Sequence, residues 1–95
     1  IGARVVDMRW IAPLPIDDIL REAEATGAVL VVDETRCSGG VAEGVLAALI
    51  DGGFGGRMAR VTSKDSFIPL GDAAKLMLLS EPEIEAAVER LLAPR

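Results

Sequence analysis

The residues Ala28–Asp33 read AVLVVD and are the most informative segment of this 95-residue chain. It is an uninterrupted aliphatic run with a glycine directly before it and charged residues at its end. A short run of this kind is typical of a strand buried on both faces, as in a parallel sheet covered by helices. The sequence therefore predicts a central strand of an α/β domain here.

Helical patterns flank this strand on both sides. Before it, apolar residues recur at helical spacing from Ile16 to Ala23, and Asp17 and Asp18 lie where the helix dipole favours negative charge. Gly27 is the expected left-handed end of that helix. After the strand, a second helix is predicted to end at the run GGFGG; its apolar stripe contains Val41, Val45, Ala48 and Leu49 and is widened by Leu46 and Ile50.

Two more strands are expected. Arg4–Trp10 carries adjacent valines and then alternating apolar residues, which predicts a mostly buried strand that Pro13 and Pro15 end. Met58–Lys64 has a β-branched centre and predicts a further strand, followed by an irregular segment from residue 65 to 71.

The end of the chain predicts helical structure. A short helical turn is expected from Asp72 to Leu79. Ser80 and Glu83 then form an S-x-x-E capping box, which marks the start of the last helix. Its buried stripe is predicted to consist of Ile84, Ala87, Val88, Leu91 and Leu92.

Strands and helices thus alternate three times, the order of a parallel sheet with right-handed crossovers. We expect a three-layer α/β/α domain with a mainly parallel sheet, and residues 1–95 are too few for a second domain. Three strands make a thin sheet. Because the chain also opens at Ile1 without a methionine, we expect it to be a fragment that lacks the amino-terminal part of its domain.

The amino-acid composition of the chain limits the kinds of binding partner and the cellular compartment that we expect. Fifteen acidic and ten basic residues give a net charge of −5, which disfavours nucleic acid and anionic membranes and favours a basic protein partner. No apolar run approaches the roughly 20 residues of a membrane-spanning helix, and no secretory leader is recognised. The single cysteine, Cys37, cannot form an internal disulfide, so we expect a cytoplasmic protein with a reduced thiol.

The sequence offers little for catalysis. It contains no histidine, and Cys37 has no cysteine partner, which excludes Ser–His–Asp, Cys–His and cysteine-based zinc sites within these residues. We therefore predict no catalytic, cofactor-binding or metal residues in this segment.

One loop remains a candidate site, because ligands of open α/β sheets bind beyond the carboxyl ends of the strands. Its glycines fall at positions 39, 40 and 44, which matches neither the dinucleotide fingerprint nor the phosphate-binding loop. Two interpretations stay open, an interface with a partner and the binding of a small anion at the start of the second helix. The candidate residues are Asp33, Glu34, Arg36, Ser38, Gly39 and Gly40.

Three strings, taken in order, carry a resemblance through nearly the whole chain. VVDMRWIAPLPIDDIL has a strand with an arginine (Arg9) and a P-L element (Pro13, Leu14) that opens the next helix. VLVVDETRCSGGVAEGVLAAL has an apolar strand with an acidic end and a glycine pair, and RVTSKDSFIPLGDAAKLMLLSEPEIEAAVERLL has a last strand, an "IP" loop and a closing helix. Together they resemble the carboxy-terminal domain of transketolases, 1-deoxyxylulose-5-phosphate synthases and the beta subunits of 2-oxo acid dehydrogenase decarboxylating components.

The resemblance implies an enzyme as the parent protein. Such enzymes bind thiamine diphosphate and Mg²⁺ between other domains, and this domain contributes to subunit association. RVTSKDSFIP is most similar to the dehydrogenase beta subunits of pyruvate or branched-chain type, whose carboxy-terminal region docks the basic subunit-binding domain of the acyltransferase. FIPLGD is also similar to the deoxyxylulose-phosphate synthases.

Three functions follow as hypotheses. The first is a non-catalytic assembly and docking domain of a 2-oxo acid dehydrogenase, in a homo- or hetero-oligomer. The second is the same domain of a transketolase or a 1-deoxyxylulose-5-phosphate synthase. The third is an unrelated small module that binds an anion in the loop from Asp33 to Gly40.

Overall fold

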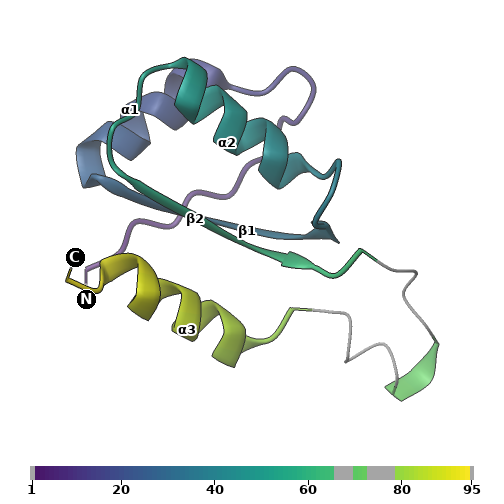
Figure 1. Ribbon diagram of the computed structural model, residues 1–95. Coiled ribbons are helices and arrows are strands. Elements are labelled where there is room, and N and C mark those ends of the chain that lie inside the picture. Colours follow the sequence, from purple (N-terminus) through teal and green to yellow (C-terminus); the bar gives the residue numbers. More distant parts are fainter. Residues whose placement is uncertain (1, 66–69, 73–78, 95) are drawn as a thin grey trace.

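The computed structural model describes residues 2–65, 70–72 and 79–94. Its elements follow in the order α1 (Ile16–Thr26), β1 (Ala28–Arg36), α2 (Val41–Asp51), β2 (Arg57–Ser63) and α3 (Glu81–Leu92), as Figure 1 shows. Residues 73–78 of the helical turn predicted from Asp72 to Leu79, and residues 66–69 of the irregular segment predicted before it, lie outside the described residues. No helix in the described part of the chain has the length and apolarity to cross a membrane.

The two strands form a parallel pair, as predicted. Ala28 pairs with Arg57 and the register continues to Asp33 opposite Thr62, after which an irregularity leads to Arg36 opposite Ser63. The predicted strand Met58–Lys64 is therefore confirmed, beginning and ending one residue earlier as β2. Its partner β1 is the strand predicted from the AVLVVD run, extended by three residues.

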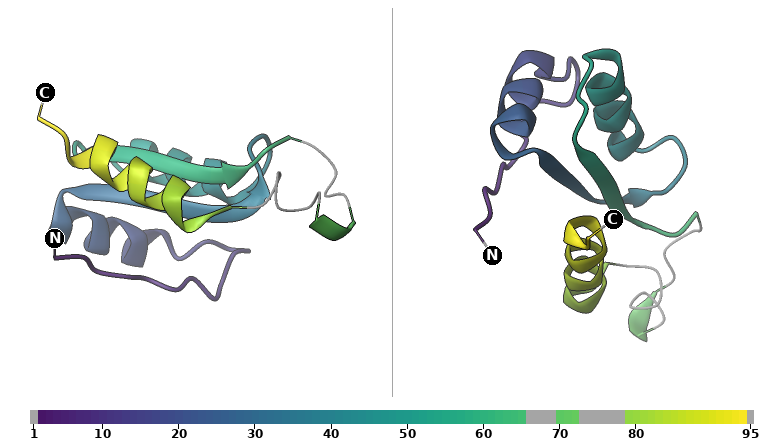
Figure 2. Two further views of the ribbon diagram at one scale, coloured as in Figure 1. Left: turned by 90° about the horizontal axis from the view of Figure 1, so that it is seen from below. Right: turned by 60° about the vertical axis from the view of Figure 1, so that its left-hand side comes forward.

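Helices cover both faces of this pair. Helices α1 and α2 lie side by side on one face, while α3 lies on the other face against both strands (Figure 2). The predicted three-layer α/β/α arrangement is confirmed.

The core lies between the sheet and the first two helices. Its buried members are Ala23, Val45, Leu49 and Phe54, with Leu49 fully buried. Phe54 comes from the GGFGG run, which the sequence indicated only as a helix end. This run brings the phenylalanine back under α2, where it supplies the only aromatic ring of the core cluster in the described part of the chain.

Three residues predicted in the apolar stripes lie outside them, and the first is Ile16, which begins α1 and is 46% exposed. Ile50 is 63% exposed on α2, because Val45 and Leu49 already face the sheet and the next residue is turned away by about 100°. Leu92 is 45% exposed, since it is the last residue of α3.

The helix ends follow local rules. Gly27 ends α1 with a left-handed φ of 79°, and its N–H donates to the carbonyl of Ala23. Ser80 precedes α3 in an extended conformation, and its hydroxyl accepts a hydrogen bond from the N–H of Glu83. Arg57 at the start of β2 donates from its guanidinium to the carbonyls of Leu91 and Ala93, at the other end of α3.

The predicted strand Arg4–Trp10 is wrong for the described structure. This segment is irregular and joins no sheet; Val5 is 90% exposed and Trp10 is 71% exposed. Met8 packs against the core, and Arg4 forms an ion pair of 2.7 Å with Glu22 of α1. A strand needs an adjacent backbone with which to form hydrogen bonds, and neither β1 nor β2 pairs with this segment.

The prediction that β1 is buried on both faces is also wrong. Val29 and Val31 are half-buried towards the core, but Val32 is 47% exposed on the opposite face. With only β2 beside it, β1 is an edge strand in the described part of the chain.

Candidate functional site: the loop between β1 and α2

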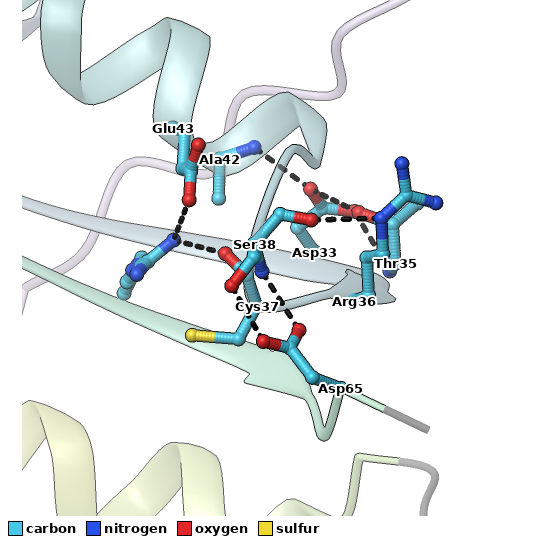
Figure 3. A network of polar contacts seen from close by, with 9 residues as sticks. Asp33, Thr35, Arg36, Cys37, Ser38, Ala42, Glu43 and Asp65 are labelled. Atoms are coloured by element: carbon cyan, nitrogen blue, oxygen red, sulfur yellow. Dashed lines mark hydrogen bonds and ion pairs between the residues drawn. The ribbon is translucent and has the colours of Figure 1, made fainter. Parts of the chain in front are cut away.

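The loop that follows β1 is organised around the carboxylate of Asp33 (Figure 3). One carboxylate oxygen accepts the N–H of Thr35 at 3.0 Å, and the other accepts the Thr35 hydroxyl at 2.7 Å. The second oxygen also accepts the N–H of Ala42 at 2.8 Å. Asp33 therefore caps the start of α2 from nine positions upstream, in place of the residue directly before the helix.

These contacts set the charge state of Asp33. Partial burial of its carboxylate tends to raise its pKa, but the hydrogen bonds from Thr35 and from the first amides of α2 outweigh burial. The pKa of Asp33 thus lies below its ordinary value, and the residue is an anion at neutral pH.

A second carboxylate holds the middle of the loop. Asp65, just after β2, accepts the N–H of Ser38 at 2.8 Å and also the Ser38 hydroxyl (Figure 3). These hydrogen bonds, the one from the hydroxyl first, lower the pKa of Asp65 below its ordinary value. Arg36, the last residue of β1, donates to the carbonyl of Ser38 at 2.8 Å, so Ser38 is held from the ends of both strands.

The local backbone geometry explains why glycine occupies both predicted loop positions. Gly39 has a φ of 72°, in the left-handed region that favours glycine. A side chain at Gly40 would collide with the Thr35 hydroxyl and would lie 2.6 Å from the carbonyl oxygen of Arg36. The glycine pair therefore serves close packing between the loop and the strand end.

The sequence analysis missed the nearby Thr35 and Glu43 and two residues of this network that lie far away in sequence. Arg60 of β2 donates to the carbonyl of Cys37 at 2.7 Å and lies 3.8 Å from the carboxylate of Glu43. Asp65 comes from beyond β2. Both are distant from the loop in sequence, and only the parallel pairing of the strands places them beside it.

The remaining candidate residue, Glu34, is exposed, and its carbonyl accepts the buried hydroxyl of Ser63 at 2.8 Å. The six predicted residues therefore lie together at the end of β1 and in the loop that follows it, with Glu34 and Arg36 among the exposed ones. Their role as an interface stays a prediction.

The hydrogen bonds of this loop argue against the hypothesis that it binds a small anion. The amide of Ala42 at the start of α2 already binds the Asp33 carboxylate, and the amide of Ser38 binds Asp65. An anion would have to displace these carboxylates and would meet their negative charge. The arrangement thus gives no support to a phosphate-like ligand at this position.

Comparison with known proteins places the chain in a family. Residues 1–91 match the family described as the transketolase C-terminal domain. The chain is 37% identical over 91 residues to a 1-deoxy-D-xylulose-5-phosphate synthase of Polaromonas sp. (strain JS666 / ATCC BAA-500), a match that covers 93% of the chain and 14% of that protein. It is 32% identical over 95 residues to the pyruvate dehydrogenase E1 component subunit beta of Bacillus subtilis (strain 168), covering 97% of the chain and 29% of that protein.

A third relative is a 1-deoxy-D-xylulose-5-phosphate synthase of Cupriavidus pinatubonensis (strain JMP 134 / LMG 1197), which is 34% identical over 96 residues; the match covers all of the chain and 15% of that protein. No solved structure matches the chain significantly. The chain spans between 14% and 29% of the length of these three curated relatives. From the family match and these relatives together, the chain belongs to the transketolase C-terminal domain family.

Proposed function

We propose that residues 1–95 form a non-catalytic assembly domain of a larger thiamine-diphosphate enzyme, here called the parent. One observation carries this proposal. At the sheet edge where open α/β domains bind ligands, the polar groups of the β1–α2 loop are engaged with one another. Asp33 holds the start of α2 and Asp65 holds Ser38, so both carboxylates are already engaged by donors of the loop and of the start of α2.

The cofactor would be held by other parts of the parent. In the described residues, no group of three or more His, Cys, Asp or Glu side chains lies close enough together to hold a metal ion. The carboxylates of Asp33 and Asp65 also point their oxygens at amide and hydroxyl donors. These residues therefore do not suit the Mg²⁺ ion that accompanies thiamine diphosphate, and no catalytic step is assigned to them.

Calorimetric titration of thiamine diphosphate with Mg²⁺ tests this division of roles. We expect the parent to bind the cofactor and the 95-residue chain not to bind it. We also expect the parent to form smaller assemblies when residues 1–95 are removed. Cofactor binding by the 95-residue chain alone, or an unchanged molar mass and turnover after removal, would overturn the proposal.

For the parent reaction, we propose the decarboxylation of a 2-oxo acid and transfer of the acyl group to a lipoyl carrier. The RVTSKDSFIP string supports this reaction, and so does the relation to a pyruvate dehydrogenase beta subunit over 97% of the chain. The relation to 1-deoxy-D-xylulose-5-phosphate synthases, at 37% identity, supports condensation chemistry on sugar phosphates as a second candidate. Assaying the parent for lipoyl acylation and for sugar-phosphate turnover separates the two.

The proposed partner is a basic protein surface, such as the subunit-binding domain of an acyltransferase. Helix α3 supports this role, because Glu81, Glu85 and Glu89 recur every four residues and are all exposed. Reversal of charge in Glu85→Lys with Glu89→Lys should weaken association of the parent with a basic partner domain, whereas Asp17→Lys on α1 should not. Equal weakening by both would contradict this surface. A cytoplasmic location stays a prediction.

A further inference from the structure

We draw no further inference here: the strongest candidate, the cavity of about 440 Å³ at the amino-terminal end of the two strands, lined by Gly27, Gly56 and Arg57, carries no proposal because the guanidinium of Arg57 already donates to the carbonyls at the end of α3, so the cavity belongs to a contact already described.

Discussion

The carboxylate of Asp33 accepts a hydrogen bond of 2.8 Å from the backbone N–H of Ala42 and thereby joins the end of β1 to the start of α2. Gly40, which directly precedes α2, has no side chain with which to cap the helix. Asp33 supplies that function and at the same time closes a turn through Thr35. The acidic residue at the end of β1 thus stabilises the conformation of the loop.

Removal of this side chain should destabilise the domain. Asp33→Ala loses three hydrogen bonds, and we expect a loss of about 1–3 kcal/mol in the free energy of unfolding, measured by urea denaturation. Asp51→Ala is the matched control. Asp51 is an exposed carboxylate at the last residue of α2, where the helix dipole disfavours it, so stability should be unchanged or slightly higher. Equal effects of the two substitutions would contradict the capping role.

The lowered pKa of Asp33 predicts a pH dependence. Because the pKa is lower in the folded than in the unfolded chain, the stabilisation is complete above the unfolded value of about 3.9 and is lost as the pH falls through the folded value. The stability difference between the unsubstituted chain and Asp33→Ala should be constant from about pH 7 to 5 and should shrink below about pH 4. A difference that grows on acidification would contradict this assignment.

Gly40 is predicted to be intolerant of a side chain. Gly40→Ala places a methyl group 2.6 Å from the carbonyl oxygen of Arg36, which is backbone and cannot move aside cheaply. We expect a loss of about 1–3 kcal/mol by thermal or urea denaturation. Gly55→Ala meets no atom within 4 Å and should be neutral or slightly stabilising. A neutral Gly40→Ala would show that the loop has room the structure does not contain.

Arg57 should anchor the end of α3 to the sheet. Arg57→Met keeps the aliphatic stem but removes the donors to the carbonyls of Leu91 and Ala93, and we expect a loss of about 1–2 kcal/mol. Arg21→Met removes an exposed ion pair with Asp18 and should cost less than about 1 kcal/mol. Denaturation of both variants under one set of conditions compares them. If Arg21→Met lowers the free energy of unfolding as much as Arg57→Met does, the contacts of Arg57 with the end of α3 have no special role in stability.

Elements whose signals are local were predictable from the sequence. The helix start at Ser80 and the end at Gly27 depend on residues within one turn of each boundary, and both are confirmed. β1 was predictable because an aliphatic run of that length suits a strand regardless of its neighbours.

Features that depend on contacts distant in sequence were not predictable. Alternating apolar residues in Arg4–Trp10 favour a strand, but a strand also needs an adjacent backbone, which the pattern does not specify. Asp33 was correctly placed at the edge of the sheet. Its hydrogen bond to α2 spans nine residues, whereas the usual N-cap rule considers only the residue directly before the helix. Asp65 reaches Ser38 only because β1 and β2 pair in parallel.

If this domain supports an enzyme without taking part in its chemistry, a parent that combines Glu34→Ala and Arg36→Ala should keep its turnover. These are the charged candidate side chains on the loop surface. We expect turnover per assembled active site to change by less than about twofold, because an acid–base group would contribute about 100-fold or more. A fall of that size, with cofactor binding and molar mass unchanged, would contradict it.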